Sequence, residues 1–454
     1  GVPADVIRRI ASEYLAAPSA VVYGRMGTST QAFGSLCQWL IAAINAVSGN
    51  LDRPGGAMFT QPAFDVIRGP KALRAGKGSF GRWKSRVRGL PEFGGELPVA
   101  ALAEEILEEG DGRVRALFTS AGNPVLSTPN GRQLDRAFAS LEFMVSLDPY
   151  LNETTRHARV ILPPASALER EHYDVAFHVY AVRNTAKYSL PVFEKPRGAL
   201  HDWEIFHELA HRLSVLRDGK RAKKRAQYEV LRRMGPSGII ALGLRFGPYG
   251  AKANPLKRGL SLRALESSPH GVDLGPLEPC LLQRLSTRDR RLHLAPPELV
   301  KDLARLRATF PPEPTTDQGS SLLLIGRRHL RDNNSWLHNV PKLMAGKPRC
   351  TLMLHPDDAK ARGLDNGALA EVRSRVGEVV VPVEIDEDIM QGVVSLPHGY
   401  GHAREGVIQR VATSHPGVSI NDLTDEQAID PVTGNAAFSG VQVEVRTARA
   451  SRVE

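Results

Sequence analysis

One short pattern in the sequence combines residue types and spacing that could do chemistry directly. His207, Glu208 and His211 form the pattern His-Glu-x-x-His. On a helix the two histidines lie one turn apart and can both bind zinc, while the glutamate can act as a general base. The pattern therefore raises the hypothesis of a zinc hydrolase, which would still need a third ligand.

The residues around this pattern favour a different interpretation. The extended zinc motif continues with a glycine and a third histidine, but Ser214 and Arg217 occupy those positions. The apolar residues recur at helical spacing and form one arc, which contains Trp203, Phe206, Leu209, Ala210 and Leu213. Because both histidines flank this arc, an amphipathic packing helix explains the pattern, and zinc hydrolysis stays an alternative.

The cysteines do not supply a metal or redox motif. Cys37, Cys280 and Cys350 are far apart and form no Cys-x-x-Cys pair. The 454 residues therefore contain no motif for an iron–sulfur cluster, a zinc ribbon or a disulfide framework. Cys37 falls within a predicted apolar helix, which is typical of a buried small side chain.

Composition predicts several soluble domains and an anionic partner. The hydrophobic fraction is 42% and the charged fraction 24%, and no apolar run reaches the roughly 18 residues of a transmembrane helix. The net charge of +10 suits a phosphorylated cofactor or another anion. The densest basic run, residues 217–225, has no interleaved aromatic residues, so nucleic acid is not predicted as a partner.

The elements that must position any site follow an α/β pattern in the first part of the chain. We expect a helix over 4–17, a short buried strand over 20–24, a loop over 27–30 and a helix over 31–47. Residues 55–98 are rich in glycine, proline and arginine and predict an irregular segment. The elements expected next are a helix over 99–109, a strand over 114–119, a helix over 131–140 and strands over 143–147 and 159–162.

The last third of the chain changes character. Residues 313–320 are polar and rich in turn formers, and predict a linker. Six short β-type runs follow, over residues 322–325, 352–354, 368–374, 378–385, 393–396 and 441–445. Short strands at this spacing predict a mostly β, barrel-like domain.

One long stretch carries a family resemblance. Residues 152–169 read NETTRHARVILPPASALE, with a Glu-Thr pair, a strand that ends in Leu-Pro, a small pair and a closing Glu169. This stretch resembles a signature of the molybdopterin oxidoreductases, the dimethyl sulfoxide reductase superfamily. It departs from the family at Arg159, where aspartate is usual.

Three further segments resemble the same family in the family's order. Residues 359–377 approximate a second signature, residues 49–56 resemble its Gly-Asn segment, and residues 120–124 resemble its nucleotide-side loop. The chain is identified as a member of this family over essentially its whole length. The resemblance implies Rossmann-like α/β parallel-sheet domains followed by a C-terminal six-stranded, double-psi-like β-barrel.

The implied domains are the end of one α/β molybdopterin domain (1–58), a second such domain (59–312), the linker (313–320) and the dinucleotide-binding barrel (321–454). The implied cofactor is molybdenum or tungsten on two molybdopterin guanine dinucleotides. Asp148, at the carboxyl end of its strand, can accept the two parallel N–H groups of a guanine edge. The residues carried over as cofactor-binding are Gly122, Asn123, Pro124, Asp148, Glu153, Thr154, Asp202, Gly326, Arg327, Asn334, Ser335, Trp336 and Asn421.

The resemblance also implies parts that this sequence does not contain. Family members usually begin with a cysteine-rich [4Fe–4S] segment, followed by the protein ligand to the metal, and we expect both to precede Gly1. The catalytic residue and the metal ligand are therefore unassigned. A small-molecule substrate, an electron-transfer subunit and a cytoplasmic location are expected.

Formate dehydrogenases are the most similar group, because they share the order of segments and the 333–339 stretch. However, members of that group often hold their substrate with an arginine soon after the Gly-Asn segment, and residues 58–65 contain none before Arg68. The substrate thus stays open. A non-catalytic scaffold with the same fold is the other alternative.

Overall fold

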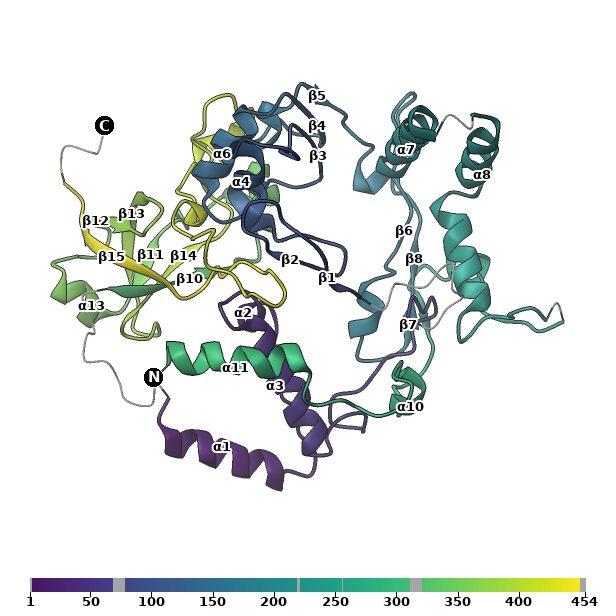
Figure 1. Cartoon of the computed structure of the whole chain (residues 1–454), viewed down its shortest axis with the longest axis horizontal. Helices are drawn as coiled ribbons and strands as arrows, with labels where there is room; N and C mark the ends of the chain where they lie inside the picture. The colour runs from purple at the N-terminus through teal and green to yellow at the C-terminus, as the bar shows by residue number, and fades with distance from the viewer. Residues whose placement is uncertain (1, 68–77, 219–220, 255, 311–320, 450–454) are drawn as a thin grey trace. The chain divides into compact units, whose positions relative to one another are not determined.

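The computed structural model describes residues 2–67, 78–218, 221–254, 256–310 and 321–449 (Figure 1). The chain packs as two compact units. The first unit comprises residues 1–23, 41–77 and 164–294, and the second comprises residues 24–40, 78–163 and 295–454. Both units are assembled from separated stretches, whereas the predicted domains are contiguous. The predicted linker at 313–320 lies outside the described residues.

The N-terminal part of the first unit corrects one prediction. The helix expected over 4–17 is confirmed as α1 (Ala4–Ala16). The buried strand expected over 20–24 is wrong, because the backbone there finds a side chain instead of a neighbouring strand. The Val22 N–H donates to Asn45 Oδ1 at 3.0 Å, and Asn45 Nδ2 donates to the Val22 carbonyl at 2.8 Å. The adjoining Tyr23 side chain is exposed.

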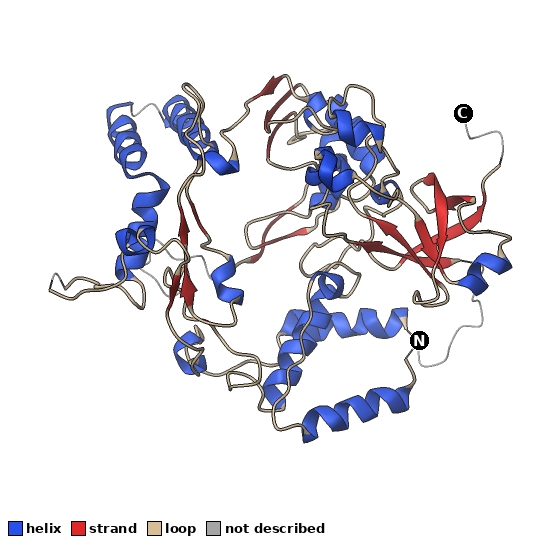
Figure 2. Cartoon of the chain, turned by 180° about the vertical axis from the view of Figure 1, so that it is seen from behind, coloured by secondary structure: helices blue, strands red, loops and turns tan. Residues whose placement is uncertain are grey.

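The remainder of the first unit packs helices against short strand pairs. The helices α7 (Asp202–Asp218) and α8 (Arg221–Phe246) lie side by side (Figures 1 and 2). The helix α8 is kinked at Gly235, whose φ is 57°, just before Pro236. The smaller elements are β6 (His172–Tyr173), β7 (Thr185–Ala186), β8 (Tyr188–Ser189), β9 (Val272–Asp273), the 3-10 helices Ala167–Glu169 and Phe177–Tyr180, α9 (Leu262–Glu266) and α10 (Leu281–Arg284).

The second unit contains a three-stranded parallel sheet, in the order β3–β4–β5. The strands are β3 (Ala116–Ser120), β4 (Phe143–Leu147) and β5 (Val160–Ile161), and the helices that accompany them are α4 (Leu102–Leu107), after a 3-10 turn at Val99–Ala101, α5 (Pro124–Ser127), α6 (Gly131–Ala139) and the 3-10 turn Thr155–His157. Apolar residues of α4 and α6, including Ile106, Leu134 and Phe138, pack against Met144 of β4. These elements match the sequence expectation, although the stronger claim of Rossmann-like domains stays a prediction.

Two further segments, each with residues in both units, differ from the sequence expectation. The loop expected over 27–30 contains a short helix, α2 (Met26–Ser29), and the following helix α3 begins at Gly34 and ends at Val47. The irregular segment expected over 55–98 includes a small antiparallel pair, β1 (Phe80–Lys84) with β2 (Pro91–Phe93). The helix α11 (Pro297–Thr309) belongs to the second unit.

A closed barrel of six strands forms the rest of the second unit, as predicted (Figure 2). Its order around the barrel is β10–β14–β11–β13–β12–β15. The strands are β10 (Leu322–Arg327), β11 (Leu352–Leu354), β12 (Leu369–Arg373), β13 (Glu378–Ile385), β14 (Val393–Pro397) and β15 (Val441–Thr447). Alternate residues such as Leu322 and Leu324, or Val379, Val381 and Val383, fill the interior. Its double-psi-like character stays a prediction.

The loops of the barrel carry short helices that shape the site below. They are the 3-10 turn Trp336–Asn339, α12 (Pro341–Met344), α13 (Pro356–Ala361), α14 (Arg410–Ser414) and the 3-10 turn Ile420–Asp422. Within the described ranges, no helix is both long and apolar enough to span a bilayer.

Candidate functional site

The loop after β3 forms the first part of the site. Ala121 adopts a φ of 50°, and Asn123 sits at the start of α5, where its side chain is buried. Asn123 Nδ2 donates to Glu153 Oε2 at 2.7 Å, and the Thr154 hydroxyl donates to Asn123 Oδ1 at 2.7 Å. The structure thus brings together the predicted residues of the 120–124 loop and of the Glu-Thr pair.

Asp148 follows β4 directly and is 5% exposed. Its Oδ1 accepts the Tyr150 N–H at 2.8 Å, and its Oδ2 accepts only a longer bond of 3.3 Å from Asn152 Nδ2. No basic side chain among the described residues forms an ion pair with it, and burial raises its pKa above the ordinary value. Asp148 is therefore a buried carboxylate with acceptor capacity to spare.

A line of four buried ionisable side chains starts at Glu153. Glu153 Oε1 lies 2.8 Å from His402 Nδ1, and His402 Nε2 lies 2.9 Å from His338 Nδ1. His338 Nε2 in turn lies 3.2 Å from Asp332 Oδ1. Both histidines and Glu153 are completely buried, and Asp332 is 3% exposed. The line connects the α/β part of the second unit with two loops of its barrel.

Both carboxylates of this line favour their ionised form. Burial raises the pKa of Glu153, but the hydrogen bond and charge of His402 and the bond from Asn123 outweigh it, so the net shift is downward. For Asp332, burial is likewise outweighed by His338 and Arg349, and the pKa is lowered. The line therefore begins and ends in negative charge.

The end of β10 presents two guanidinium groups without carboxylate partners. Arg327 donates to the backbone carbonyls of Ser395 and Thr351, at 2.5 and 2.8 Å. Arg328 donates to the side-chain oxygen of Asn334. Neither arginine forms an ion pair within the described part of the chain, and burial lowers the pKa of both. The carboxylates of Glu384 and Asp332 act on Arg327 only from a distance and do not outweigh the effect of burial on its pKa.

The other predicted residues of the barrel lie in different surroundings. Ser335 is buried, with its Oγ 3.5 Å from Asn123 Nδ2, whereas Trp336 is 48% exposed. Asn421 is completely buried and donates to the Leu126 carbonyl at 2.7 Å, while its Oδ1 accepts from Thr424. Asn421 thus joins the loop before β15 to α5. Gly326 precedes Arg327 at the end of β10, and Pro124 begins α5 next to Gly122 and Asn123.

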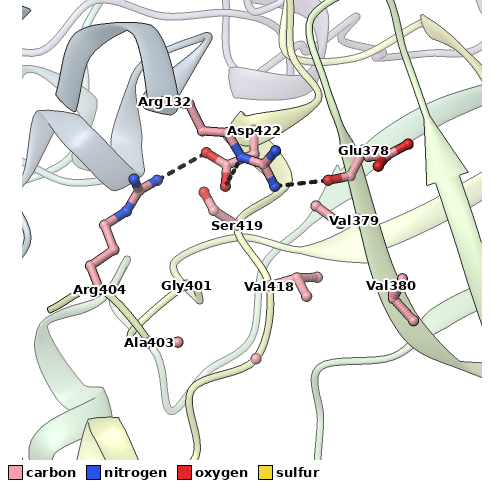
Figure 3. Close-up of a pocket in the computed structure, with 11 residues that line it drawn as sticks. Arg132, Glu378, Val379, Val380, Gly401, Ala403, Arg404, Val418, Ser419 and Asp422 are labelled. Carbon is pink, nitrogen blue, oxygen red and sulfur yellow. Dashed lines mark hydrogen bonds and ion pairs between the residues drawn. The ribbon is translucent and has the colours of Figure 1, made fainter. Parts of the chain in front are cut away.

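A cavity of about 410 Å³ opens between α6 and the barrel loops of the second unit (Figure 3). Arg404 and Arg132 both reach Asp422, at 3.0 and 3.3 Å, and Arg132 also donates to the Glu378 carbonyl. Gly401 has a φ of 116° there, and a Cβ would lie 2.8 Å from the Ser419 side chain. Position 401, which lines the cavity, therefore requires glycine.

Asp202 belongs to the first unit, whereas the other predicted site residues belong to the second. It starts α7 and accepts a 2.9 Å bond from Arg170. It lines a cavity of about 370 Å³ with His201, Tyr173 and Trp203. The Tyr173 hydroxyl and His201 Nδ1 are buried there without a hydrogen-bond partner, so this cavity offers free polar groups to a ligand.

The two histidines of the opening motif contact one aromatic ring. The Tyr228 ring of α8 stacks on His207 at 4.4 Å and on His211 at 4.5 Å between centroids. The His207 Nε2 also lies 2.9 Å from the Tyr228 carbonyl, and Glu208 pairs with Arg212. No group of three potential metal ligands occurs in the described residues. The contacts of both histidines are those of a helix–helix packing surface.

Comparison with family models identifies the protein family to which this chain belongs. The family model described as molybdopterin oxidoreductase matches residues 10–212, and the model described as molydopterin dinucleotide binding domain matches residues 322–443. The chain belongs to the molybdopterin oxidoreductase family. Its barrel is the dinucleotide-binding domain of that family, which indicates a molybdopterin cofactor with a metal.

Several members of the molybdopterin oxidoreductase family are similar over most of the chain. Trimethylamine-N-oxide reductase of Haemophilus influenzae is 24% identical over 88% of this chain and 51% of its own length. The F420-dependent formate dehydrogenase subunit alpha of Methanocaldococcus jannaschii is 24% identical over 91% and 58%. The assimilatory nitrate reductase catalytic subunit of Bacillus subtilis is 25% identical over 77% and 45%. The chain spans about half the length of these curated relatives.

A solved structure shares the fold. Acetylene hydratase from Pelobacter acetylenicus superposes with a TM-score of 0.69 over 99% of this chain and 63% of its own, at 15% identity. The likeness at this identity concerns the fold alone. It shows that the α/β elements and the barrel occur together in another protein of known structure.

Sequence reasoning does not find the centre of the buried line in this member of the molybdopterin oxidoreductase family. His402 was not singled out, and neither Asp332 nor Arg328 was assigned to the site. The signal available was the pair of histidines in Pro397-His398-Gly399-Tyr400-Gly401-His402, directly after a predicted strand. Nothing in the spacing connected it with Glu153, which is 249 positions away.

Proposed function

We propose that this chain forms the molybdopterin guanine dinucleotide-binding portion of a molybdenum or tungsten oxidoreductase that carries out two-electron redox of a small-molecule substrate. The observation that carries the proposal is Asp148, a buried carboxylate without a basic partner at the carboxyl end of a parallel strand. Such positions bind nucleotides in open α/β sheets. The family membership supplies the class of cofactor.

The chemistry of Asp148 fits guanine. A guanine edge presents its N1–H and 2-amino groups in parallel, and an ionised carboxylate accepts both. Because Asp148 has only one short hydrogen bond within the protein, these two donors would satisfy its remaining lone pairs. A base with acceptors at the same positions would instead face the carboxylate charge.

The pyrophosphate of such a dinucleotide suits the end of β10. Arg327 and Arg328 provide positive charge with no ion-pair partner in the described residues. Gly326 allows close backbone approach beside them, and Asn334 and Ser335 add donors in the following loop. We assign these residues, with Trp336, to cofactor binding.

The remaining predicted residues stabilise the conformation of the site. Gly122 and Pro124 set the path of the loop, while Asn123, Glu153 and Thr154 form one hydrogen-bonded group beside it. Asn421 ties the barrel to α5. Asp202, in the cavity of the first unit, is assigned to a second dinucleotide, because that cavity contains unpartnered polar atoms of its own.

When bound, the metal–pterin group supplies the two-electron redox chemistry, and the protein supplies binding, orientation and electrostatics. The arginines at the end of β10 neutralise the anionic cofactor, and Asp148 fixes its base. The buried groups around Asn123 exclude water from the same region. An electron-transfer subunit and a cytoplasmic location complete the proposal.

Three substrates are candidates for this enzyme: formate, an N-oxide and nitrate. A formate dehydrogenase-like enzyme is one candidate, supported by the similarity to formate dehydrogenase subunits. Residues 58–65 lack the arginine expected of that group, and Arg68 lies outside the described residues. Reduction of an N-oxide or of nitrate, as the names of two relatives state, is therefore a candidate of equal standing.

Analysis of the purified full-length protein tests the proposal. We expect about one molybdenum or tungsten ion per chain and about two guanine nucleotides per metal ion after acid release. A full-length protein without metal and pterin, expressed in cells that make the cofactor, would instead support the non-catalytic scaffold. Stoichiometric zinc would favour the hydrolase alternative.

A further inference from the structure

The positive charge of the chain is concentrated in one segment. Residues 217–263 contain 13 lysines and arginines and two acidic residues, a balance of +11, whereas the rest of the chain carries −1, from 46 basic and 47 acidic residues. The family models match residues 10–212 and 322–443, and this segment lies between the two matches. Neither matched region therefore accounts for the charge. Such a segment indicates an anionic partner of its own.

Most of the described cations in this segment have no carboxylate partner. Glu229, the one acidic residue of the segment whose side chain is described, pairs with Arg232 at 3.2 Å. Arg245 donates to the Lys252 carbonyl at 3.1 Å, a contact that does not neutralise its charge. The exposed cations without an ion pair among the described residues are Arg225, Arg233, Arg245, Lys252, Lys257, Arg258 and Arg263.

The second half of α8 is apolar on its outer face as well as on its inner face. On the inner face, Leu244 is completely buried in the core of the first unit. On the outer face, Leu242 and Phe246 are 39% and 40% exposed, and Arg245 is the one charged residue within 236–246. A helix that is apolar on all sides is normally covered on all sides. The outer face therefore favours contact with an apolar partner over contact with water.

A cavity of about 870 Å³ lies along this outer face, between α8 and residues 251–254 and 257–262 of the first unit. Met234 and Leu242 contribute apolar side chains to its wall. Arg245, Lys257 and Arg258 contribute positive charge, and no acidic residue lines it among those that the structure describes. The apolar face of α8 and the unpaired cations thus meet in one place.

Leu256 distinguishes a ligand confined to this cavity from an extended surface. It is 92% exposed, precedes Lys257 and Arg258, and does not line the cavity. The loop that contains it projects away from α8 (Figures 1 and 2). A small anion or a peptide within the cavity would leave Leu256 in water. An anionic lipid surface would cover the loop and the α8 face together, because cations contact the headgroups while apolar side chains enter the layer beneath.

We propose that this face of the first unit, formed by the outer side of α8 and the loop around Leu256, docks on an anionic lipid surface. The contact is peripheral: the unpaired cations bind headgroups, and Leu256 and Leu242 enter the interface. Apolar side chains and a basic patch each give weak binding, and together they give stable binding. The proposal does not depend on the metal or the substrate, and it does not rest on the proposed function.

Vesicle sedimentation of the full-length protein tests the docking. We expect binding to vesicles of phosphatidylcholine with about one third phosphatidylglycerol, and none to phosphatidylcholine alone. Binding should decrease when the salt concentration is raised from about 0.05 M to about 0.5 M, because salt screens charges at a surface. Equal binding to both vesicles would overturn the proposal. Binding to neither, with binding of an amphipathic peptide of glutamate and leucine, would show that the cavity takes a protein segment and that lipid docking is wrong.

Two charge variants test the place of the contact. Lys257→Gln combined with Arg258→Gln should weaken partitioning to the anionic vesicles by about 30-fold, because each cation near the surface contributes separately. The matched control is Lys342→Gln combined with Lys347→Gln, which removes the same charge from exposed positions of the barrel domain. We expect the control to bind within about 2-fold of wild type. Equal losses in the two pairs would overturn the proposal, because overall charge alone would then govern binding.

Leu256→Ser tests the apolar part of the contact. We expect about 10-fold weaker partitioning, because one leucine side chain no longer leaves water on binding. Since Leu256 is 92% exposed, the thermal unfolding midpoint should be unchanged. Leu282→Ser is the control, because Leu282 is 64% exposed and lies in α10. Wild-type partitioning of Leu256→Ser would overturn the insertion of this loop.

Discussion

Asp430 Oδ2 accepts two hydrogen bonds from Ser35, one from its backbone N–H and one from its hydroxyl, both 2.8 Å long. Ser35 lies in the first turn of α3, whereas Asp430 lies in the loop before β15, 395 positions later. Asp430 Oδ1 also accepts the N–H groups of Val432 and Thr433. One buried carboxylate therefore caps a helix and orders a loop.

Replacement of this carboxylate should destabilise the protein strongly. In Asp430→Asn, an amide replaces one acceptor oxygen, so one set of N–H donors loses its partner in a fully buried place. We expect the free energy of unfolding to fall by about 2–3 kcal/mol. Urea unfolding followed by circular dichroism measures this change.

Ser35→Ala is the matched control for that change, because it removes only the hydroxyl bond and leaves the backbone N–H in place. Its cost should be about 1 kcal/mol. Equal losses for the two variants would show that the loop bonds of Asp430 contribute nothing measurable.

Asp135 should make the protein sensitive to acid. It contacts Arg156 and His157 at 2.6 Å and Arg404 at 2.9 Å. Burial opposes ionisation, but these bonds and charges outweigh it and lower its pKa from 3.8 to about 2. Since the folded-state pKa lies below the unfolded value, the stabilisation is present above pH 4 and is lost as the pH falls from about 4 to about 2.

The corresponding variant is Asp135→Asn. Allowing for solvent screening of a group that is partly exposed, we expect a loss of about 1–2 kcal/mol at pH 7. The difference from wild type should shrink when unfolding is measured below pH 3. A difference that stays constant over this pH range would contradict the assignment of the shift to Asp135.

The sequence predicts the barrel well, because each strand alternates between interior and exposed positions and turns separate the strands. Val379, Val381 and Val383 show this period within a single strand. The prediction of a strand over 20–24 is wrong, because this segment has no neighbouring strand with which to pair. Its apolar run is local, but its backbone partner is the side chain of Asn45, which periodicity cannot identify.

The candidate site likewise contains one residue that the sequence predicts and one contact that it does not. Asp148 was predictable, because a carboxylate directly after a strand lies at the ligand-binding edge of a parallel sheet. The contact of Glu153 with His402 was not, because it depends on how the barrel loops pack on the α/β part of the second unit. A single sequence contains no spacing rule for two residues 249 positions apart.

The histidines of the His-Glu-x-x-His pattern should be dispensable for metal content. His207→Ala and His211→Ala remove ring contacts with Tyr228, so we expect only a modest loss of stability, about 1 kcal/mol each. Metal analysis of the full-length variants should give the wild-type molybdenum or tungsten content. Loss of stoichiometric zinc in either variant would instead restore the hydrolase hypothesis.

Asp148→Asn should change base preference as well as affinity. The asparagine amide keeps one acceptor but places an N–H₂ donor opposite a donor of guanine, which should weaken binding by about 2–3 kcal/mol. Xanthine carries a carbonyl at that position and should bind the variant better than guanine does. Calorimetry with guanosine and xanthosine monophosphates on the cofactor-free protein measures both affinities. Because burial raises the pKa of Asp148, wild-type binding of guanosine monophosphate should weaken on acidification earlier than an ordinary aspartate would allow. Identical preferences in wild type and variant would remove Asp148 from the nucleotide site.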